Sequence, residues 1–295
     1  YLTCTGNEKI TILQKIFTQQ IESIIKKYGR GYYCATFLFS RHIREATWIY
    51  YTFLRLPDEL VDSQSVTDRE QKLNTWIDEW HTILQNNTST HHNKVLTSFK
   101  KVMQDYRIPT EYSFSFLKTM QQDFTISKYA TYTELENYMY GSAVVVGYTM
   151  SYIIGFSDGA LSYAKALGEA FQMTNFLRDI REDYEIRGRI YLPLEDMDRY
   201  GVTINHIKNH CVDTAWQSLI KFEIDRTKAL YEKGVLGISM LHPRGRKAVY
   251  ASVLMYKEIL DRIEKSNYDV FSTRAVVSPF RKTMILLRVL WKRNL

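Results

Sequence analysis

The chain has 295 residues, of which 45% are hydrophobic and 24% are charged. These proportions exclude a disordered or low-complexity chain and are typical of a soluble globular protein, here expected to form one domain over residues 1–295. The formal net charge of +7 excludes no class by itself, but it favours anionic partners such as phosphorylated small molecules, nucleic acid or an acidic membrane surface.

The N-terminal stretch does not resemble a signal peptide, because Lys15 and Glu22 interrupt its apolar residues. The three cysteines form no CxxC pair, and their odd count argues against a disulfide framework or a zinc ribbon. His206, His210 and Cys211 contain one i, i+4 pair but no evident third ligand, so no zinc site is predicted there. We therefore expect a reducing compartment, the cytoplasm.

Helical periodicity runs through almost the whole chain, beginning with apolar residues at positions 10, 13, 17, 21 and 24. It predicts further helices over residues 41–56, 65–85 and 93–106, and another that begins near residue 111 after the turn at Pro109. Additional helices are predicted over residues 133–156, 160–185, 213–236, 243–266 and 279–292. No run of alternating residues predicts a strand, so we expect an all-α fold of roughly ten helices.

Two acids, Asp58 and Asp62, follow the helix predicted to begin at residue 41, and Tyr51 and Arg55 share their spacing. Like charges at i and i+4 destabilise a helix by a few tenths of a kcal/mol, so the pair suggests a cation that offsets the repulsion. Pro57, directly before Asp58, removes a helical hydrogen bond and predicts a kink at this point.

An uncharged segment, residues 137–157, has about the length of a membrane-spanning helix. It contains small and polar residues such as Gly141, Ser142 and Gly147, and the chain has no second candidate span. A helix that is buried on all sides at the centre of a bundle is therefore the preferred interpretation. Its small residues would allow another surface, or a long hydrocarbon ligand, to approach the backbone closely.

A second acidic cluster lies on the helix predicted over residues 160–185 and consists of Gln172, Asn175, Asp179 and Asp183. At about 100° per residue these positions fall within roughly 80° of one helix face. Carboxylate pairs on two helices predict a Mg²⁺ site that holds a substrate's phosphate groups, because Mg²⁺ prefers oxygen ligands. The alternative is that both pairs are solvated faces, neutralised by arginines such as Arg178 and Arg181.

The last predicted helix is basic and amphipathic. Its apolar stripe contains Phe280, Met284, Leu287 and Trp291, and its basic stripe contains Arg281, Arg288 and Lys292. Such a helix either lies on an anionic membrane surface or docks on the protein as an ordinary terminal helix. Peripheral membrane contact is therefore one of two hypotheses for this segment.

Four stretches carry a resemblance in addition to these patterns: residues 51–62 (YTFLRLPDELVD), 138–147 (YMYGSAVVVG), 172–193 (QMTNFLRDIREDYEIRGRIYLP) and 256–274 (YKEILDRIEKSNYDVFSTR). In this order they resemble the squalene and phytoene synthase family, most closely its bacterial phytoene synthases. The resemblance runs from about residue 29 to about residue 282. It implies an isoprenoid-synthase-like helical bundle around a central cavity.

The resemblance implies that two geranylgeranyl diphosphates condense head to head to phytoene, through a cyclopropylcarbinyl diphosphate and with release of diphosphate. It also implies a metal site for Mg²⁺, with Mn²⁺ as the alternative, formed by Asp58, Asp62, Asn175, Asp179 and Asp183. The residues expected to bind the diphosphate groups are Arg30, Arg55, Gln172, Asn175, Arg189, Tyr256 and Arg274.

Two tyrosines of the uncharged segment, Tyr138 and Tyr140, are expected to face the reacting carbocation. An aromatic ring stabilises a nearby cation by about 0.5–2 kcal/mol, although core packing explains these residues nearly as well. Many family members carry Ser-Lys-Ser-Phe where this chain has Gly29-Arg30-Gly31-Tyr32, so backbone amides and Arg30 are expected to replace the missing hydroxyls. No GxGxxG follows a strand, so no NADPH is expected.

Other functions remain open at this point. A relative that uses C15 substrates would make dehydrosqualene, squalene or presqualene diphosphate from farnesyl diphosphate, and substrate length depends on a cavity depth that the sequence does not give. An inactive scaffold or assembly factor of the same fold is a non-enzymatic alternative, although both acidic pairs are retained here. No nucleic-acid-binding signature is found, so no nucleic acid partner is expected. The sequence does not determine the oligomeric state.

Overall fold

A computed structural model describes residues 21–26, 30–63, 66–85 and 93–292, with the backbone alone for residues 30–32. This part of the chain is helical and contains no strand beyond two isolated bridges, Lys128 with Ile190 and Phe156 with Leu241. The predicted all-α fold is therefore confirmed.

The first half of the chain contains α2 (Arg30–Thr36), α3 (Arg41–Asp62), α4 (Arg69–Gln85), α5 (Lys94–Tyr106), α6 (Thr110–Gln122), α7 (Tyr132–Met139), the π-helical turn η1 (Tyr140–Val144) and α8 (Val145–Ile154). The second half contains α9 (Ala160–Arg187), α10 (Leu194–Arg199), α11 (Ile204–Lys208), α12 (Thr214–Leu236), the short 3₁₀ helix η2 (Gly237–Met240), α13 (Pro243–Lys265) and α14 (Pro279–Trp291).

Most predicted helices occur within a few residues of their expected bounds, while the short α2, α10 and α11 were not predicted. The first predicted helix, residues 10–24, lies mainly outside the described residues, of which 21–26 are helical. Short helices are missed because one or two turns do not establish a periodic pattern.

Helix α3 corrects one prediction, because it continues through Pro57 and ends at Asp62 rather than at residue 56. Proline removes one backbone donor, but the ring of Pro57 is buried, and the surrounding packing favours the helical path. The continuous helix keeps Asp58 and Asp62 one turn apart, on the same rigid element as Arg55.

Most of the uncharged segment is buried or half-buried at the centre of the fold, as predicted, but Tyr140 is exposed and the segment is not one regular helix. The π-helical turn η1 separates α7 from α8, and the residues around this turn, including Gly141, Val144 and Val145, are buried. No helix among the described residues is both long and apolar enough for a membrane crossing.

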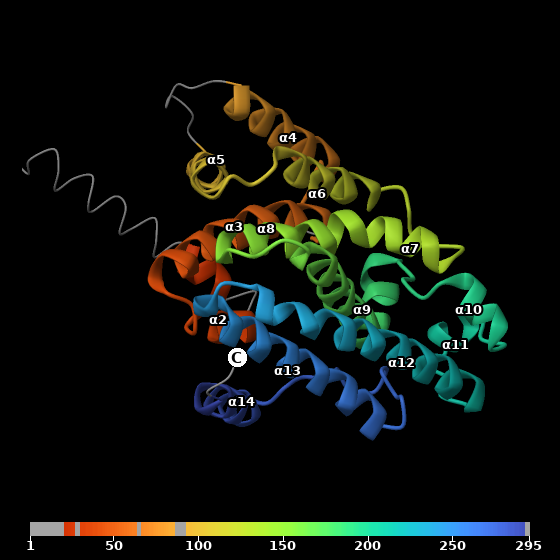
Figure 1. The fold of residues 1–295 in the computed structure, drawn as a ribbon. Helices are drawn as coiled ribbons and strands as arrows, with labels where there is room; N and C mark the ends of the chain where they lie inside the picture. The colour runs from red at the N-terminus through yellow and green to blue at the C-terminus, as the bar shows by residue number, and fades with distance from the viewer. Residues whose placement is uncertain (1–20, 27–29, 64–65, 86–92, 293–295) are drawn as a thin grey trace, which may run out of the picture.

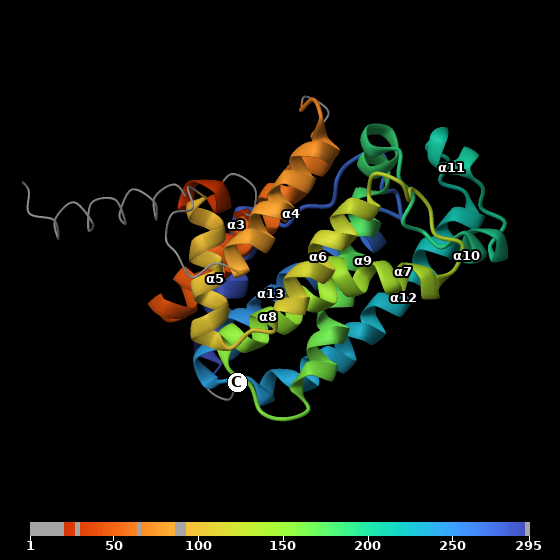
Figure 2. The ribbon, with the colours of Figure 1, turned by 90° about the horizontal axis from the view of Figure 1, so that it is seen from above.

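The long helix α9 organises the bundle: it packs against α12 on one side and against η1 and α8 on the other. One apolar core joins α9, α12 and α13 through residues such as Leu177, Trp216 and Leu260. A second core joins α3, α4 and α5 through Phe53, Trp80 and Phe99. In Figures 1 and 2, α10 and α11 lie at one end of the molecule, away from α5.

A glycine in α9 sets the distance between α9 and the central segment. A Cβ atom on Gly168 would lie 2.7 Å from the carbonyl oxygen of Ala143 and 3.1 Å from its carbonyl carbon. Backbone atoms cannot rotate away as side chains do, so α9 and η1 approach this closely only because residue 168 has no side chain.

We expect Gly168→Ala to destabilise the protein by about 1–3 kcal/mol, because the added methyl group overpacks a backbone contact. In an unconstrained helix the same change is stabilising by about 1 kcal/mol, so the sign of the effect is diagnostic. Urea unfolding of the two proteins measures it, and a variant more stable than the wild type would contradict the packing argument.

Candidate active site

A cavity of about 1100 Å³ lies inside the bundle and is lined by α3, α6, α8, α9, α13 and the segment that leads into α14. It is larger than most ligand pockets, which enclose about 300–1000 Å³. Acids and arginines line one part of it. Much of the remaining wall is apolar and includes Phe116, Met120, Val146, Met150 and Leu167. This lining suits a ligand with an anionic head and a long hydrocarbon chain.

The two acidic clusters predicted from the sequence line this one cavity. Asp58 and Asp62 extend from the last turns of α3, and Asp179 and Asp183 extend from the C-terminal half of α9. Arg187 joins the two clusters, with its Nε 3.0 Å from Asp62 Oδ2 and its Nη1 3.1 Å from Asp183 Oδ1. The predicted facing arrangement of the two helices is therefore present in the structure.

Arginines supply the positive charge around these acids. Arg55 pairs with Asp58 and, at 2.7 Å, with Glu59. Asp179 lies between Arg178 and Arg274, whose Nε atoms are 2.8 Å and 2.7 Å from Asp179 Oδ1. Arg189 Nη1 is 3.0 Å from Asp62 Oδ1.

The pKa values of the acids differ with their surroundings. Burial, reinforced by the carboxylate of Asp62, raises the pKa of Asp58 to about 6. Burial likewise raises the pKa of Asp183 to about 7, although Arg187 acts in the opposite direction. Burial also acts to raise the pKa of Asp179, but hydrogen bonds from Arg178 and Arg274 outweigh it and lower that pKa. Burial therefore disfavours the ionised forms of Asp58 and Asp183, despite the arginines.

The donor set fits hard divalent cations. The aspartates of both clusters and Asn175 line the same wall and offer carboxylate and amide oxygens, the ligand type that Mg²⁺ and Mn²⁺ prefer. The raised pKa values of Asp58 and Asp183 indicate carboxylates that a cation would stabilise in their ionised form. The side chains present therefore fit the predicted metal site.

A tyrosine network lies next to the acids. The Tyr138 hydroxyl donates to Asp123 Oδ2 at 3.2 Å and lies 3.3 Å from the Tyr191 hydroxyl. Arg189 donates to the backbone carbonyl of Asp123 at 3.2 Å. The other carboxyl oxygen of Asp123, Oδ1, is buried and has no hydrogen-bond partner. This network fixes Tyr138 at the cavity wall, where its ring contacts the rings of Tyr129, Tyr191 and Phe176.

Most of the predicted site residues reach the cavity, including Arg55, Gln172, Asn175, Arg189, Tyr256 and Arg274. Tyr140 does not: it is 42% exposed and does not line the cavity, so its predicted place at the site was wrong. Residues two apart on a helix point about 200° apart, so Tyr138 and Tyr140 cannot face the same cavity. The side chain of Arg30 lies outside the described part of the structure.

The sequence analysis missed Asp123, Arg187 and Tyr191. Arg187 lies one helical turn after Asp183, so the i, i+4 rule could have identified it as a partner of that acid. Tyr191 lies within the 172–193 motif but shows no periodic relation to the acids. Asp123 lies just after α6, where the chain path depends on tertiary packing, and no sequence signal places it near the site.

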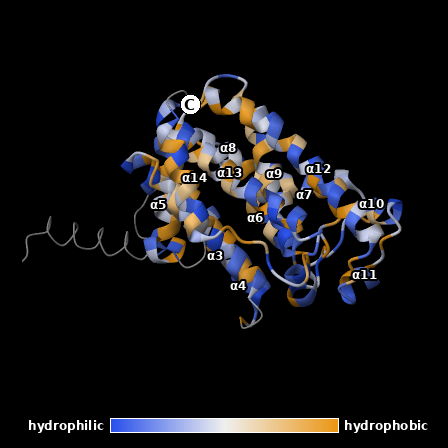
Figure 3. Cartoon of the chain, turned by 90° about the horizontal axis from the view of Figure 1, so that it is seen from below, coloured by the Kyte–Doolittle hydropathy of each residue, from blue (hydrophilic) through white to orange (hydrophobic). Residues whose placement is uncertain are grey.

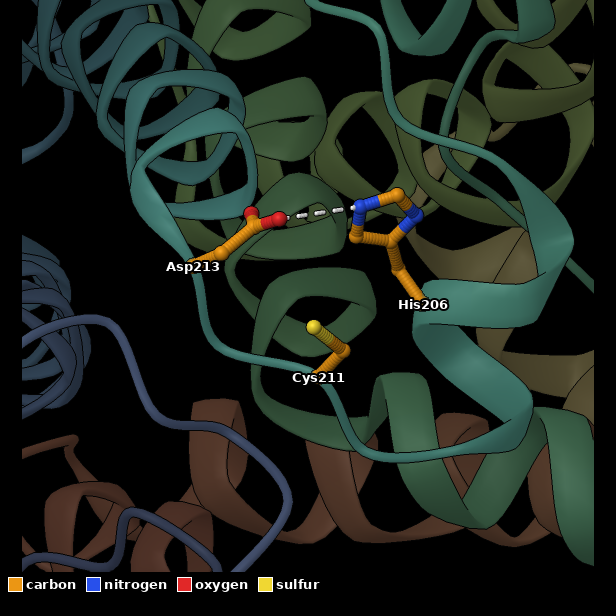
Figure 4. A group of neighbouring side chains, drawn as sticks. All are labelled: His206, Cys211 and Asp213. Atoms are coloured by element: carbon orange, nitrogen blue, oxygen red, sulfur yellow. Dashed lines mark ion pairs between the residues drawn. The ribbon is translucent and has the colours of Figure 1, made fainter.

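A second cluster lies near the surface and outside the cavity, with His206 on α11 and Cys211 and Asp213 in the segment that follows this helix (Figure 4). The backbone N–H of Thr203 donates to His206 Nδ1 at 3.0 Å, and His206 Nε2 lies 3.3 Å from Asp213 Oδ2. A neutral ring that accepts at Nδ1 carries its proton on Nε2, where a metal would need a lone pair. Asp213 is therefore the third side chain of the ligand type, which the sequence analysis missed. Contacts within the protein already occupy both ring nitrogens of His206, so the cluster is assigned a structural role.

Comparisons with known proteins agree with this geometry. The profile of the family described as squalene/phytoene synthase matches residues 25–281. A 15-cis-phytoene synthase from Synechocystis sp. is 35% identical, over 92% of this chain and 83% of its own. A phytoene synthase from Arthrospira platensis is 33% identical, over 89% of each chain. A crystal structure of a dehydrosqualene synthase with a ligand superimposes with a TM-score of 0.82 at 28% identity, covering 92% of this chain and 95% of that one.

The buried carboxyl of Asp123 gives a pH-dependent stability prediction. Burial raises its pKa from 3.8 to about 7, although Arg189 acts in the opposite direction. Between these values the folded state binds more protons than the unfolded chain, so this group makes the protein less stable as the pH rises from about 4 to 7. Asp123→Asn should abolish this loss and still accept the Tyr138 hydrogen bond.

We therefore expect the stability advantage of the variant over the wild type to grow by about 1–3 kcal/mol from pH 5 to pH 8, because the pKa of Asp123 in the folded protein, about 7, lies about 2 pH units above the starting pH. Urea unfolding at both pH values, without metal, measures the change. The exposed Asp158→Asn is the matched control and should show the wild-type pH dependence. Parallel profiles for Asp123→Asn and the wild type would contradict the assignment.

Proposed function

The chain belongs to the squalene/phytoene synthase family and is a prenyltransferase, and on that premise we propose that it condenses two geranylgeranyl diphosphates head to head into phytoene. The observation that carries the proposal is the meeting of two aspartate pairs in one large, otherwise mainly apolar cavity. The names of the cyanobacterial relatives support phytoene as the product.

In this proposal Asp58, Asp62, Asp179 and Asp183, with Asn175, would hold Mg²⁺ or Mn²⁺. When bound, the metal neutralises the negative charge that develops on the leaving diphosphate oxygens. The residues proposed to bind the diphosphate groups directly are Arg30, Arg55, Gln172, Asn175, Arg189, Tyr256 and Arg274.

The remaining bond changes take place within the two substrates, and the protein would stabilise the carbocations and exclude water. Loss of the first diphosphate gives an allylic cation, which the double bond of the second substrate attacks. Loss of a proton from the resulting cation closes the three-membered ring and gives a cyclopropylcarbinyl diphosphate. A second ionisation, rearrangement and proton loss then give phytoene. Tyr138, fixed by Asp123 and Tyr191, would present its ring to these cations, and the apolar walls would exclude water. No reductant is needed for this sequence, so none is proposed.

Two alternatives make different predictions. A C15-specific relative would give a C30 product from farnesyl diphosphate. The similarity to a dehydrosqualene synthase structure is the reason to test farnesyl diphosphate as well. An inactive scaffold would turn over neither substrate. The paired acids and their arginine partners, all directed into one cavity, favour an enzyme over the scaffold.

We expect the purified chain, given geranylgeranyl diphosphate and Mg²⁺ without NADPH, to release a C40 hydrocarbon. Asp179→Asn should lower the rate at least about 100-fold, because it removes a carboxylate from the centre that stabilises the leaving group. Product analysis by chromatography and mass spectrometry measures both. A C30 product from farnesyl diphosphate alone would move the assignment to the shorter-chain relatives, and no turnover of either substrate would favour the scaffold.

We also propose that α14 rests on an anionic membrane surface. The helix docks on the protein through Ile285 and Val289, while the predicted apolar stripe faces outward, with Phe280 76% and Trp291 85% exposed. Its sequence contains no acid, and Figure 3 shows hydrophobic and hydrophilic residues side by side on this helix. The segment before α14 lines the cavity through Val276 and Val277, so the oily substrates would have a short path from a lipid layer.

Replacing both Phe280 and Trp291 by Asp should weaken binding to vesicles of mixed anionic and neutral lipids at least about tenfold, because each apolar side chain contributes about 1.5–3 kcal/mol when fully buried. Cosedimentation measures binding. Lys118→Glu on α6 is the control: it changes the net charge equally, and Figure 1 shows α6 and α14 on opposite sides of the bundle. Unchanged binding by the double variant would contradict the proposal.

A further inference from the structure

Arg187 contacts acids of both clusters, and within the described residues it is the side chain that forms ion pairs with both. Its guanidinium lies 3.0 Å from Asp62, 2.9 Å from Glu182 and 3.1 Å from Asp183. Asp62 belongs to α3, whereas the other two acids and Arg187 belong to α9. The two helices each pack mainly against other partners, α3 against α5 and α4, and α9 against α12 and α8. The Arg187 contact therefore spans the acidic part of the cavity.

The position of Arg187 makes it a built-in counter-cation. The guanidinium is 20% exposed, and it carries its positive charge because arginine is not deprotonated in proteins. It contacts one oxygen of Asp62 and one of Asp183, and both carboxylates belong to the set proposed to hold a divalent cation. A cation and Arg187 therefore compete for the same carboxylates.

We propose that Arg187 acts as a positioning residue that holds the two acidic helices together before substrate binds and makes metal binding depend on the diphosphate. A divalent cation alone gains the carboxylates but must displace Arg187 from Asp62 and Asp183, which leaves Glu182 as the one acid of the three that Arg187 still contacts. A diphosphate that arrives with the cation supplies new anionic oxygens for the displaced guanidinium. Metal and diphosphate thus bind cooperatively, and the inference rests on the proposed metal role of the acids.

Cooperative binding of this kind has a functional consequence. An acidic centre without its own counter-cation would bind divalent cations whenever they are present. The Arg187 contacts reserve the site for a cation that arrives with a diphosphate group. The same contacts keep like charges on α3 and α9 from separating the helices in the metal-free protein.

The test is calorimetric titration of Mg²⁺ into the full chain, with and without inorganic pyrophosphate as the probe. For the wild type we expect weak Mg²⁺ binding alone and much tighter binding with pyrophosphate, within the range of about 5–150-fold that is typical of coupled sites. Arg187→Met removes the charge and keeps most of the length. It should tighten Mg²⁺ binding without pyrophosphate about tenfold and reduce the enhancement by pyrophosphate about tenfold.

A second readout needs no calorimetry. The melting temperature of metal-free Arg187→Met should lie below that of the wild type, and Mg²⁺ alone should raise it more than it raises the wild-type value. Arg187→Lys keeps a charge but presents a single ammonium instead of a planar fork, so it should fall between the two. If Arg187→Met does not fold, Arg187→Lys alone still tests the inference, because its metal-free melting temperature should lie below that of the wild type and Mg²⁺ should raise it more.

Arg181→Met is the matched control, because Arg181 is on the same helix but pairs with Glu185 and the backbone of Phe271. It should bind Mg²⁺ and pyrophosphate as the wild type does. Equal Mg²⁺ affinity of Arg187→Met and the wild type without pyrophosphate would overturn the inference. Because no readout involves turnover, the proposed phytoene synthesis can fail while this inference stands, and the reverse.

Discussion

Repulsion between carboxylates inside a partly dehydrated cavity is the constraint on which this structure depends. Asp58 and Asp62 of α3 lie across from Asp179 and Asp183 of α9, and interactions between charges are much stronger here than in water. Burial, with a smaller contribution from neighbouring carboxylates, raises the pKa values of Asp58 and Asp183, so the neighbouring arginines only partly offset the cost of placing these acids here. The arrangement is unfavourable for stability, and the proposed metal ion would relieve this cost by bringing positive charge.

The rest of the bundle holds these acids in place against their repulsion. Helix α3 continues through Pro57, so its two acids are carried on a rigid element rather than on a loop. The contact between α9 and η1 is so close that Gly168 allows no side chain, which fixes the axis of α9 and with it Asp179 and Asp183. The same packing leaves the apolar part of the cavity open beside the acids. The charged part and the apolar part of the cavity are thus formed by the same helix contacts.

The sequence predicted those site residues whose relative positions are determined by helical periodicity. The stripe of Gln172, Asn175, Asp179 and Asp183 reaches the cavity because these residues are on one regular helix, whose geometry fixes their relative directions. The same rule rejects Tyr140, and applying it to Tyr138 and Tyr140 would have avoided that error. Asp123 could not be found in this way, because its position depends on how the chain leaves α6. The bounds of the domain and the compartment stay predictions.

The use of arginine, rather than lysine, around the acids follows from the same electrostatics. A lysine in a dehydrated site can lose its proton and with it its value as a counter-ion, whereas a guanidinium stays charged under such conditions. Its planar fork also lets one side chain contact several carboxylates, as Arg187 contacts Asp62 and Asp183. A permanent charge on a long side chain can keep the site assembled when empty and then turn toward an incoming diphosphate. The arginines thus stabilise the folded protein and prepare the site for its ligand through the same contacts.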